Sequence, residues 1–132
     1  MTTRKTTTTS ALTAAREASN TADAAVDTAE AEVERTAHAI QAAEAHVVDT
    51  LTDLNAGKAD VTQDTITQAR ATVEQAHRDH EWALLQRDAA HAARSRAHDE
   101  EARAHRALTA QEYLAAHKEF NDPASREAIL HE

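Results

Sequence analysis

The chain of 132 residues carries a formal net charge of −9, contains no cysteine and has alanine as its commonest residue. This length corresponds to a single domain, the lack of cysteine excludes disulfide and thiolate chemistry, and the negative charge argues against nucleic acid as a partner. No apolar run approaches the roughly 18 residues of a membrane span, and the threonine-rich N-terminus lacks the apolar core of a signal peptide. We therefore expect a cytoplasmic or particle-associated protein that binds other proteins, and neither nucleic acid nor a membrane.

The first half of the chain predicts a tail followed by one long helix. Residues 1–10 are rich in threonine and lack an apolar pattern, which is typical of a flexible tail. Ser10 can cap a helix over 11–56, and Gly57 follows where a helix C-terminus favours a residue that adopts the left-handed conformation. A turn at 57–60 is therefore expected, with a single unbroken helix through Gly57 as the alternative.

The second half of the chain predicts another long helix and a short final one. Asp60 can cap a helix over 61–121, with Gln63 completing the capping pattern three residues later. The single proline ends this helix and, with the aspartate before it, predicts the first turn of a short C-terminal helix over 122–132. Because the turn at 57–60 is short, we expect the two long helices to lie antiparallel as a hairpin.

Two rows of residues with a seven-residue step predict how the long helices pack. The first row contains mainly larger aliphatic side chains, and the second contains only alanine. When residues whose numbers sum to 116 are paired, larger side chains face alanines, as in an interlocked coiled coil. The fold class is therefore all-α, a long antiparallel helical hairpin or alanine-rich coiled coil with a short C-terminal helix. The predicted hairpin seam consists of Leu12, Val26, Val33, Ile40, Val47, Leu54, Ala69, Ala76, Ala83, Ala90, Ala97 and Ala104.

A companion row of this seam changes character along the chain. Near the turn the sum of 116 pairs Thr50 with Ile66, whereas further out it pairs Thr36 with His80 and then alanines with arginines. We expect firm packing near the turn and looser packing at the far end. Because one thin seam buries little apolar surface against the entropy of ordering the backbone, a second interface is also expected.

Two further surfaces are predicted outside the seam. An apolar stripe lies roughly 100–160° around the second helix from the alanine row, includes the only tryptophan, and consists of Trp82, Leu85, Ala89 and Ala92. We expect this stripe to contact another copy or another protein; the alternative is a tryptophan half-covered by its own neighbours. On the first helix, alanines widen the apolar arc at Ala11, Ala18, Ala25 and Ala39. A docking end is predicted from Leu108, Tyr113, Leu114, Phe120, Ile129 and Leu130.

Histidine is the only residue type that suggests site chemistry. His91, His98 and His105 recur every seven residues, so that neighbours lie about 10.5 Å apart along a helix, too far to share one metal ion. Glu74 and His77 form one Glu-x-x-His pattern, which di-iron bundles use in pairs. One glycine excludes phosphate-binding loops, and no nucleophile motif is present. We predict a solvated histidine stripe, and no catalytic residues, metal or cofactor.

These observations favour a non-enzymatic structural or assembly protein, a coiled-coil rod or clamp that self-associates or docks on a larger particle such as a phage virion. One alternative is an acidic mimic that binds another protein. Another is a His-rich, pH- or metal-responsive module, in which His80 would be most sensitive because protonation disfavours burial. A further alternative is a secreted helical-hairpin effector that binds another protein. In size the hairpin is similar to the effectors of actinobacterial specialised secretion, but residues 54–57 lack their Trp-x-Gly turn, and the residue four after Tyr113 is His117 rather than an acid.

Overall fold

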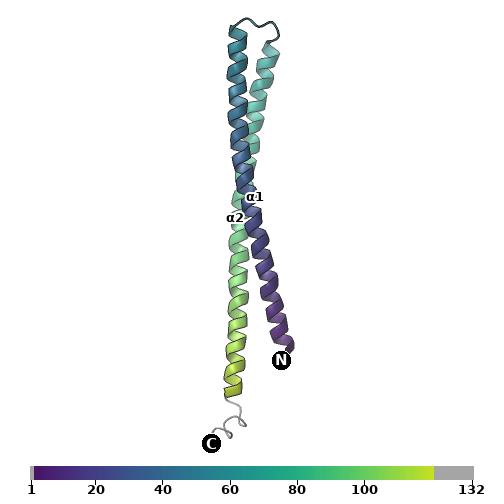
Figure 1. The fold of residues 1–132 in the computed structure, drawn as a ribbon, viewed down its shortest axis with the longest axis vertical. Helices are drawn as coiled ribbons and strands as arrows, with labels where there is room; N and C mark the ends of the chain where they lie inside the picture. The colour runs from purple at the N-terminus through teal and green to yellow at the C-terminus, as the bar shows by residue number, and fades with distance from the viewer. Residues whose placement is uncertain (1, 121–132) are drawn as a thin grey trace, which may run out of the picture. The chain divides into compact units, whose positions relative to one another are not determined.

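The computed structural model describes residues 2–120, which form two long helices, α1 (Thr2–Asn55) and α2 (Gln63–Phe120) (Figure 1). The helices pack against each other after one reversal of the chain, which confirms the all-α helical hairpin. The helical conformation is interrupted around Gly57, so the alternative of a single unbroken helix is excluded. The short helix expected over 122–132 lies outside the described residues.

Helix α1 begins at Thr2, which differs from the flexible tail expected over 1–10. No glycine or proline interrupts this stretch, and threonine hydroxyls are satisfied inside a helix by donating to the carbonyl four residues back. Thr13 donates in this way to the Thr9 carbonyl at 3.1 Å, and Thr21 to the Glu17 carbonyl at 2.9 Å. A threonine-rich segment can therefore continue the helix that the alanines after it begin.

The end of α1 is closed by a Schellman motif. Gly57 has a φ of +76°, the Gly57 N–H donates to the Leu54 carbonyl at 3.0 Å, and the Lys58 N–H donates to the Asp53 carbonyl at 3.2 Å. This pair of bonds satisfies carbonyls that the end of a helix leaves unpaired, and it requires a residue that accepts a positive φ. The Lys58 ammonium group also lies 3.1 Å from the Asp53 carboxylate.

The start of α2 is capped by Thr62, so the expected cap at Asp60 and the expected helix start at residue 61 are wrong. The Thr65 N–H donates to the Thr62 hydroxyl, and the Thr62 N–H donates to the Thr65 hydroxyl, both at 3.3 Å. This reciprocal arrangement is a capping box in which threonine replaces the usual acid at the third helical position. Aspartate and threonine are both common N-cap residues, so the sequence alone does not distinguish Asp60 from Thr62. In the structure α2 begins at Gln63, two residues later than the expected start at residue 61.

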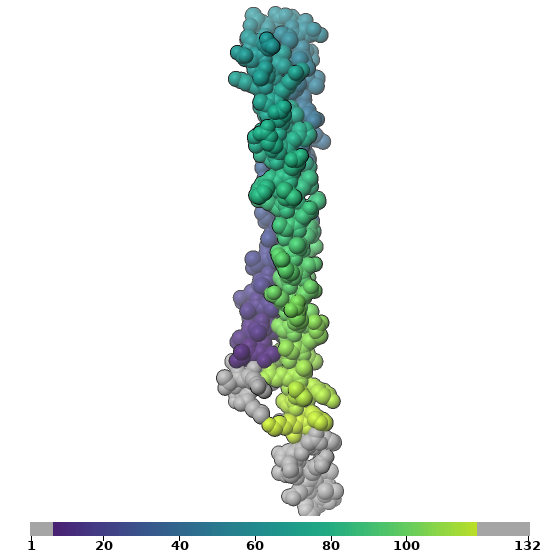
Figure 2. Space-filling model, turned by 180° about the vertical axis from the view of Figure 1, so that it is seen from behind, coloured from purple at the N-terminus to yellow at the C-terminus, as the bar shows by residue number. Residues whose placement is uncertain are grey.

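The described chain divides into two compact units, the turn unit (residues 23–93) and the terminal unit (within 1–22 and 94–132). In the turn unit the buried side chains follow a heptad spacing on both helices, namely Val26, Thr36, Ala43, Thr50, Ala69, Ala76 and Ala83. In the terminal unit Leu12 and Ser19 are buried, while Ala97 and Ala104 are half-buried. The view in Figure 2 shows the side of the turn unit on which the middle of α2 lies in front of α1.

Burial within the seam differs between large and small side chains. Val26 is only 1% exposed, but Val33, Ile40 and Val47 are half-buried, and Leu54 is 43% exposed. An alanine methyl group is too small to cover a facing valine or isoleucine completely, so the larger side chains extend to the margins of the seam. Leu54 lies in the last turn of α1, beyond the point where α2 begins to cover it.

Candidate interaction surfaces

A polar layer crosses the seam of the turn unit. Thr36 is 2% exposed, and its Oγ1 lies 2.9 Å from Nδ1 of the half-buried His80. The same Oγ1 lies 2.9 Å from the Glu32 carbonyl oxygen and 3.0 Å from the Val33 carbonyl oxygen, so its one hydrogen points to these acceptors. The Thr36 oxygen therefore accepts from His80, which carries its hydrogen on Nδ1.

The contact between Thr36 and His80 joins the two helices within the seam, and the expectation that His80 is the group most sensitive to pH stays a prediction. The contact pairs two residues whose numbers sum to 116. One polar contact inside an apolar seam is the kind of feature that selects a single register of two helices, because a slip along the seam breaks it.

One side of the seam carries two glutamate–histidine contacts between the helices. His91 Nε2 lies 3.1 Å from Glu30 Oε1, and His77 Nε2 lies 3.6 Å from Glu44 Oε1. All four side chains are at least one-third exposed, so each contact contributes under about 1 kcal/mol. These polar side chains lie along this side of the seam in the turn unit.

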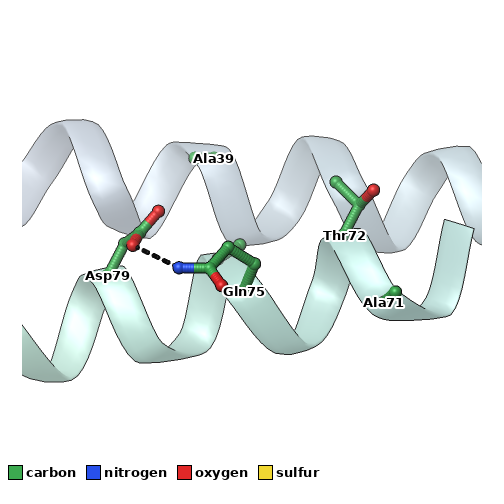
Figure 3. A pocket seen from close by; sticks show the side chains of 6 residues that line it. Ala39, Ala71, Thr72, Gln75 and Asp79 are labelled. Carbon is green, nitrogen blue, oxygen red and sulfur yellow. Dashed lines mark hydrogen bonds between the residues drawn. The ribbon is translucent and has the colours of Figure 1, made fainter. Parts of the chain in front are cut away.

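The opposite side of the seam contains a shallow hollow with small side chains. Its volume is about 420 Å³, and it is lined by Ala39 of α1 and by Ala71, Thr72, Gln75, Ala76 and Asp79 of α2. In Figure 3 Gln75 and Asp79 lie along one edge of α2, where the Gln75 amide donates to the Asp79 carboxylate at 2.9 Å. Methyl groups therefore leave this side open, in contrast to the side with the glutamate–histidine contacts.

An ion pair on α1 lies on the exposed surface of the turn unit. Arg35 Nε donates to Glu32 Oε2 at 2.9 Å, and Arg35 Nη2 donates to the other carboxylate oxygen. The hydrogen bonds from Arg35 lower the pKa of the Glu32 carboxyl group below its usual value. The pKa of Arg35 is raised by the same contact, and Asp79 on α2 adds to that rise through its negative charge.

Large apolar side chains are exposed on both helices. Trp82 and Leu85 are each 62% exposed, and Ala89 and Ala92 beside them are also exposed, so the predicted stripe faces solvent in the single chain. The reading of Trp82 as half-covered by its neighbours does not agree with this exposure. Val48 and Leu51 near the turn are exposed as well, and the sequence interpretation missed them. In the sequence, the signal for their exposure was that Val48 and Leu51 both lie outside the rows predicted to form the seam.

The predicted docking end is only partly described. Leu108 is half-buried, whereas Tyr113 and Leu114 are exposed, and the ring of Tyr113 stacks on that of His117 with centroids 6.1 Å apart. The side chain of Phe120 and both Ile129 and Leu130 lie outside the described residues. The structure therefore does not bring Tyr113 and Leu114 together with a covering apolar group among the residues it describes.

Within residues 2–120 no three or more histidine, aspartate or glutamate side chains come together as a metal site, and no helix there is long and apolar enough to span a membrane. No family model, curated protein or solved structure matches the chain. A helical hairpin serves many functions, so function has to be argued from its surfaces.

Proposed function

We propose that this protein is a non-enzymatic structural element, a coiled-coil hairpin that builds a larger assembly by associating with further copies or by docking on another protein. The observation that carries this proposal is the exposure of Trp82 and Leu85 on the outward face of α2. Aromatic and large aliphatic side chains on an exposed helical face are typical of protein interfaces.

The packing of the hairpin supports the same proposal. In the turn unit α2 contributes mainly alanines to the seam, while ordering each backbone residue costs about 1–2 kcal/mol. An alanine methyl group adds about 0.8 kcal/mol when it is buried. A second apolar contact would add to the small stabilisation that an alanine seam provides, and the exposed stripe on α2 can supply such a contact.

The hollow beside Ala39 gives little support to catalysis. A catalytic site combines a concave apolar pocket with nucleophiles or groups placed for proton transfer. This hollow is shallow, and its polar groups, Gln75 and Asp79, are already hydrogen-bonded to each other at 2.9 Å. We therefore propose a protein partner rather than a small-molecule substrate.

The mass of the full-length protein in solution tests this proposal. Sedimentation equilibrium between micromolar and millimolar concentration is expected to give a mass above the 14.3 kDa of one chain. Trp82→Ala is expected to lower that mass, whereas Tyr113→Ala, which removes an aromatic ring at the other end of α2, is the matched control. A monomer that melts cooperatively at every concentration would contradict self-association and leave only docking on a different protein.

A pH-responsive module is the second candidate, because two histidines contact glutamates across the seam. Protonation of His77 and His91 converts their contacts with Glu44 and Glu30 into ion pairs between α1 and α2. Thermal melts at pH 5.5 and pH 8 compare the wild type with the Glu30→Gln, Glu44→Gln double variant. If the protein is a pH-responsive module, the double variant loses more stability relative to the wild type at pH 5.5 than at pH 8. An equal loss at both pH values would contradict this function.

A further inference from the structure

We infer that α2 pairs antiparallel with α2 of a second copy of this chain, through the face that carries Trp82. The two hairpins then form a four-helix bundle around this contact. This pairing rests on the proposed self-association, and it specifies the surface, the orientation and the register of the dimer.

The outward face of α2 has the spacing of a helix-packing seam. Its members follow one another in alternating steps of three and four residues, and all are exposed: Thr72, Gln75, Asp79, Trp82, Gln86, Ala89, Ala93 and Arg96. A parallel row beside it is exposed as well, namely Ala71, Arg78, Leu85, Ala92 and Asp99. Because α2 is uninterrupted from Gln63 to Phe120, these positions share one face along the helix.

This face is complementary to itself in size when two copies run antiparallel. If residues whose numbers sum to 175 face each other, Trp82 lies on Ala93 of the second copy. Gln86 then lies on Ala89 of the second copy. In the neighbouring row the same register pairs residues whose numbers sum to 177, so that Leu85 lies on Ala92 of the second copy. Each contact occurs twice because the arrangement is two-fold symmetric. Large side chains therefore meet small ones, as the seam within the hairpin also does.

The same register is complementary in charge. Asp79 faces Arg96 of the second copy, and Arg78 faces Asp99 of the second copy, so four opposite-charge pairs flank the apolar centre. This arrangement of an apolar core with charged groups at its borders is typical of specific interfaces.

Neighbouring registers lose this complementarity. A shift by one heptad to a sum of 168 places Trp82 on Gln86, Asp79 on Ala89 and Arg96 on Thr72 of the second copy. Neither Asp79 nor Arg96 then faces an opposite charge on the second copy. A shift the other way, to a sum of 182, keeps Asp79 opposite an arginine, Arg103 of the second copy, but places Trp82 on Glu100 of the second copy. In that register the neighbouring row also brings Arg78 onto Arg106 of the second copy. Side-chain size and charge together therefore favour the register with a sum of 175 over the adjacent two.

Helix α1 provides a surface that permits the approach of the second hairpin. Ala39 of α1 and Thr72 of α2 line the same hollow, which places both on one side of the turn unit (Figure 3). On this side α1 carries Ala25, Ala39 and Ala42 together with the ion pair of Glu32 and Arg35, whose arginine is influenced by the charge of Asp79. The alanines between these charges let a second helix approach closely. The opposite side carries the glutamate–histidine contacts. The open side is therefore the one on which a bundle can form.

A charge-swap experiment on the full-length protein tests the pairing. In sedimentation equilibrium, Arg96→Glu and Asp79→Arg are each expected to weaken the dimer at least about tenfold, because each places like charges together twice. Combining both substitutions in one chain is expected to restore the dissociation constant to within about threefold, with the net charge unchanged. Arg70→Glu makes the same charge change at an exposed position on another face of α2 and is expected to have no effect. Circular dichroism verifies that each variant remains helical.

Disulfide trapping tests the orientation, since the chain has no cysteine of its own. Gln75→Cys and Glu100→Cys face each other at the sum of 175, although they lie about 37 Å apart along one helix. A mixture of the two variants is expected to form a cross-linked heterodimer, whereas neither variant alone cross-links. Cross-linking of Gln75→Cys with itself would show a parallel dimer and overturn the pairing. A dimer that resists every charge reversal would overturn the pairing but leave self-association standing, and a monomeric wild type would overturn both.

Discussion

Replacing Thr36 by valine removes the acceptor of the hydrogen bond that joins the two helices inside the seam. The two side chains have nearly the same shape, so the change deletes a hydroxyl group without opening a cavity. His80 Nδ1, which lies 2.9 Å from the Thr36 oxygen, then loses its partner in a half-buried position. An unsatisfied buried donor costs about 1–3 kcal/mol, and the partial access of His80 to water places the expected loss at about 1–2 kcal/mol.

Three variants separate the hydrogen bond from other effects of the substitution: Thr28→Val, His80→Leu, and Thr36→Val combined with His80→Leu. Thr28→Val is the matched control, because the Thr28 hydroxyl also donates to the carbonyl four residues back, at 3.1 Å, but Thr28 is exposed. Thr36→Val combined with His80→Leu replaces both partners by apolar groups, and we expect this double variant to be nearly as stable as the wild type. The double-mutant cycle is therefore expected to give a positive coupling of about 1 kcal/mol between the two positions.

Urea unfolding followed by circular dichroism measures these free energies at one fixed protein concentration, because association adds to apparent stability. A loss for Thr36→Val equal to that for Thr28→Val would refute the assigned role of the Thr36–His80 layer. Additive losses in the double variant would also refute it, since independent residues show no coupling.

Three further changes test local features of the hairpin. Gly57→Ala is expected to destabilise the protein by about 1 kcal/mol in urea unfolding, because φ is +76° there and a side chain disfavours that conformation. Thr62→Ala is expected to cost about 1 kcal/mol, whereas Asp60→Ala is expected to change little; the reverse order would contradict the capping box. The lowered pKa of Glu32 means that its ion pair with Arg35 is formed above the ordinary glutamate range and is lost as the pH falls through the folded value. Carboxyl NMR titration is expected to show this lowered value, and 1 M salt is expected to move it back toward normal because the pair is exposed.

The register of the helices is the feature that the sequence predicts best. The pairing of Thr36 with His80 follows from a seven-residue repeat on each helix and one turn between them, and the two side chains are hydrogen-bonded. Every seventh residue of a coiled-coil helix returns to the same face, so rows of large and small side chains in the sequence show which faces meet and in which register. The depth of burial was not predictable in the same way. Ile40 and Val47 extend past the alanines they face, and this depends on distances between helices that a repeat does not contain.

The ends of the helices and the exposure of the outer surfaces were not fully predicted from the sequence and were defined by the structure. Thr62 and Asp60 are both good N-cap residues, and the choice between them depends on how many residues the connection requires. The N-terminal threonines have weak helix propensity by themselves, but a helix that already exists at Leu12 extends through them at low cost, since propagation is easier than nucleation. Val48 and Leu51 were missed, although the seven-residue repeat already placed both of them outside the seam rows.

The contrast between the two sides of the turn unit limits the kind of assembly that the hairpin can build. A two-fold contact through Trp82 uses the same face on both copies, so it closes at two chains and cannot by itself extend into a filament. Any larger assembly therefore requires a different surface. Among the exposed large apolar side chains that such a dimer leaves uncovered, Val48 and Leu51 lie near the turn, and Tyr113 and Leu114 lie near the end of α2. We expect Val48→Glu to leave the dimer dissociation constant unchanged in sedimentation equilibrium and to abolish species larger than the dimer. If Val48→Glu weakened the dimer instead, Val48 would belong to the dimer interface, and the antiparallel pairing of α2 would be wrong.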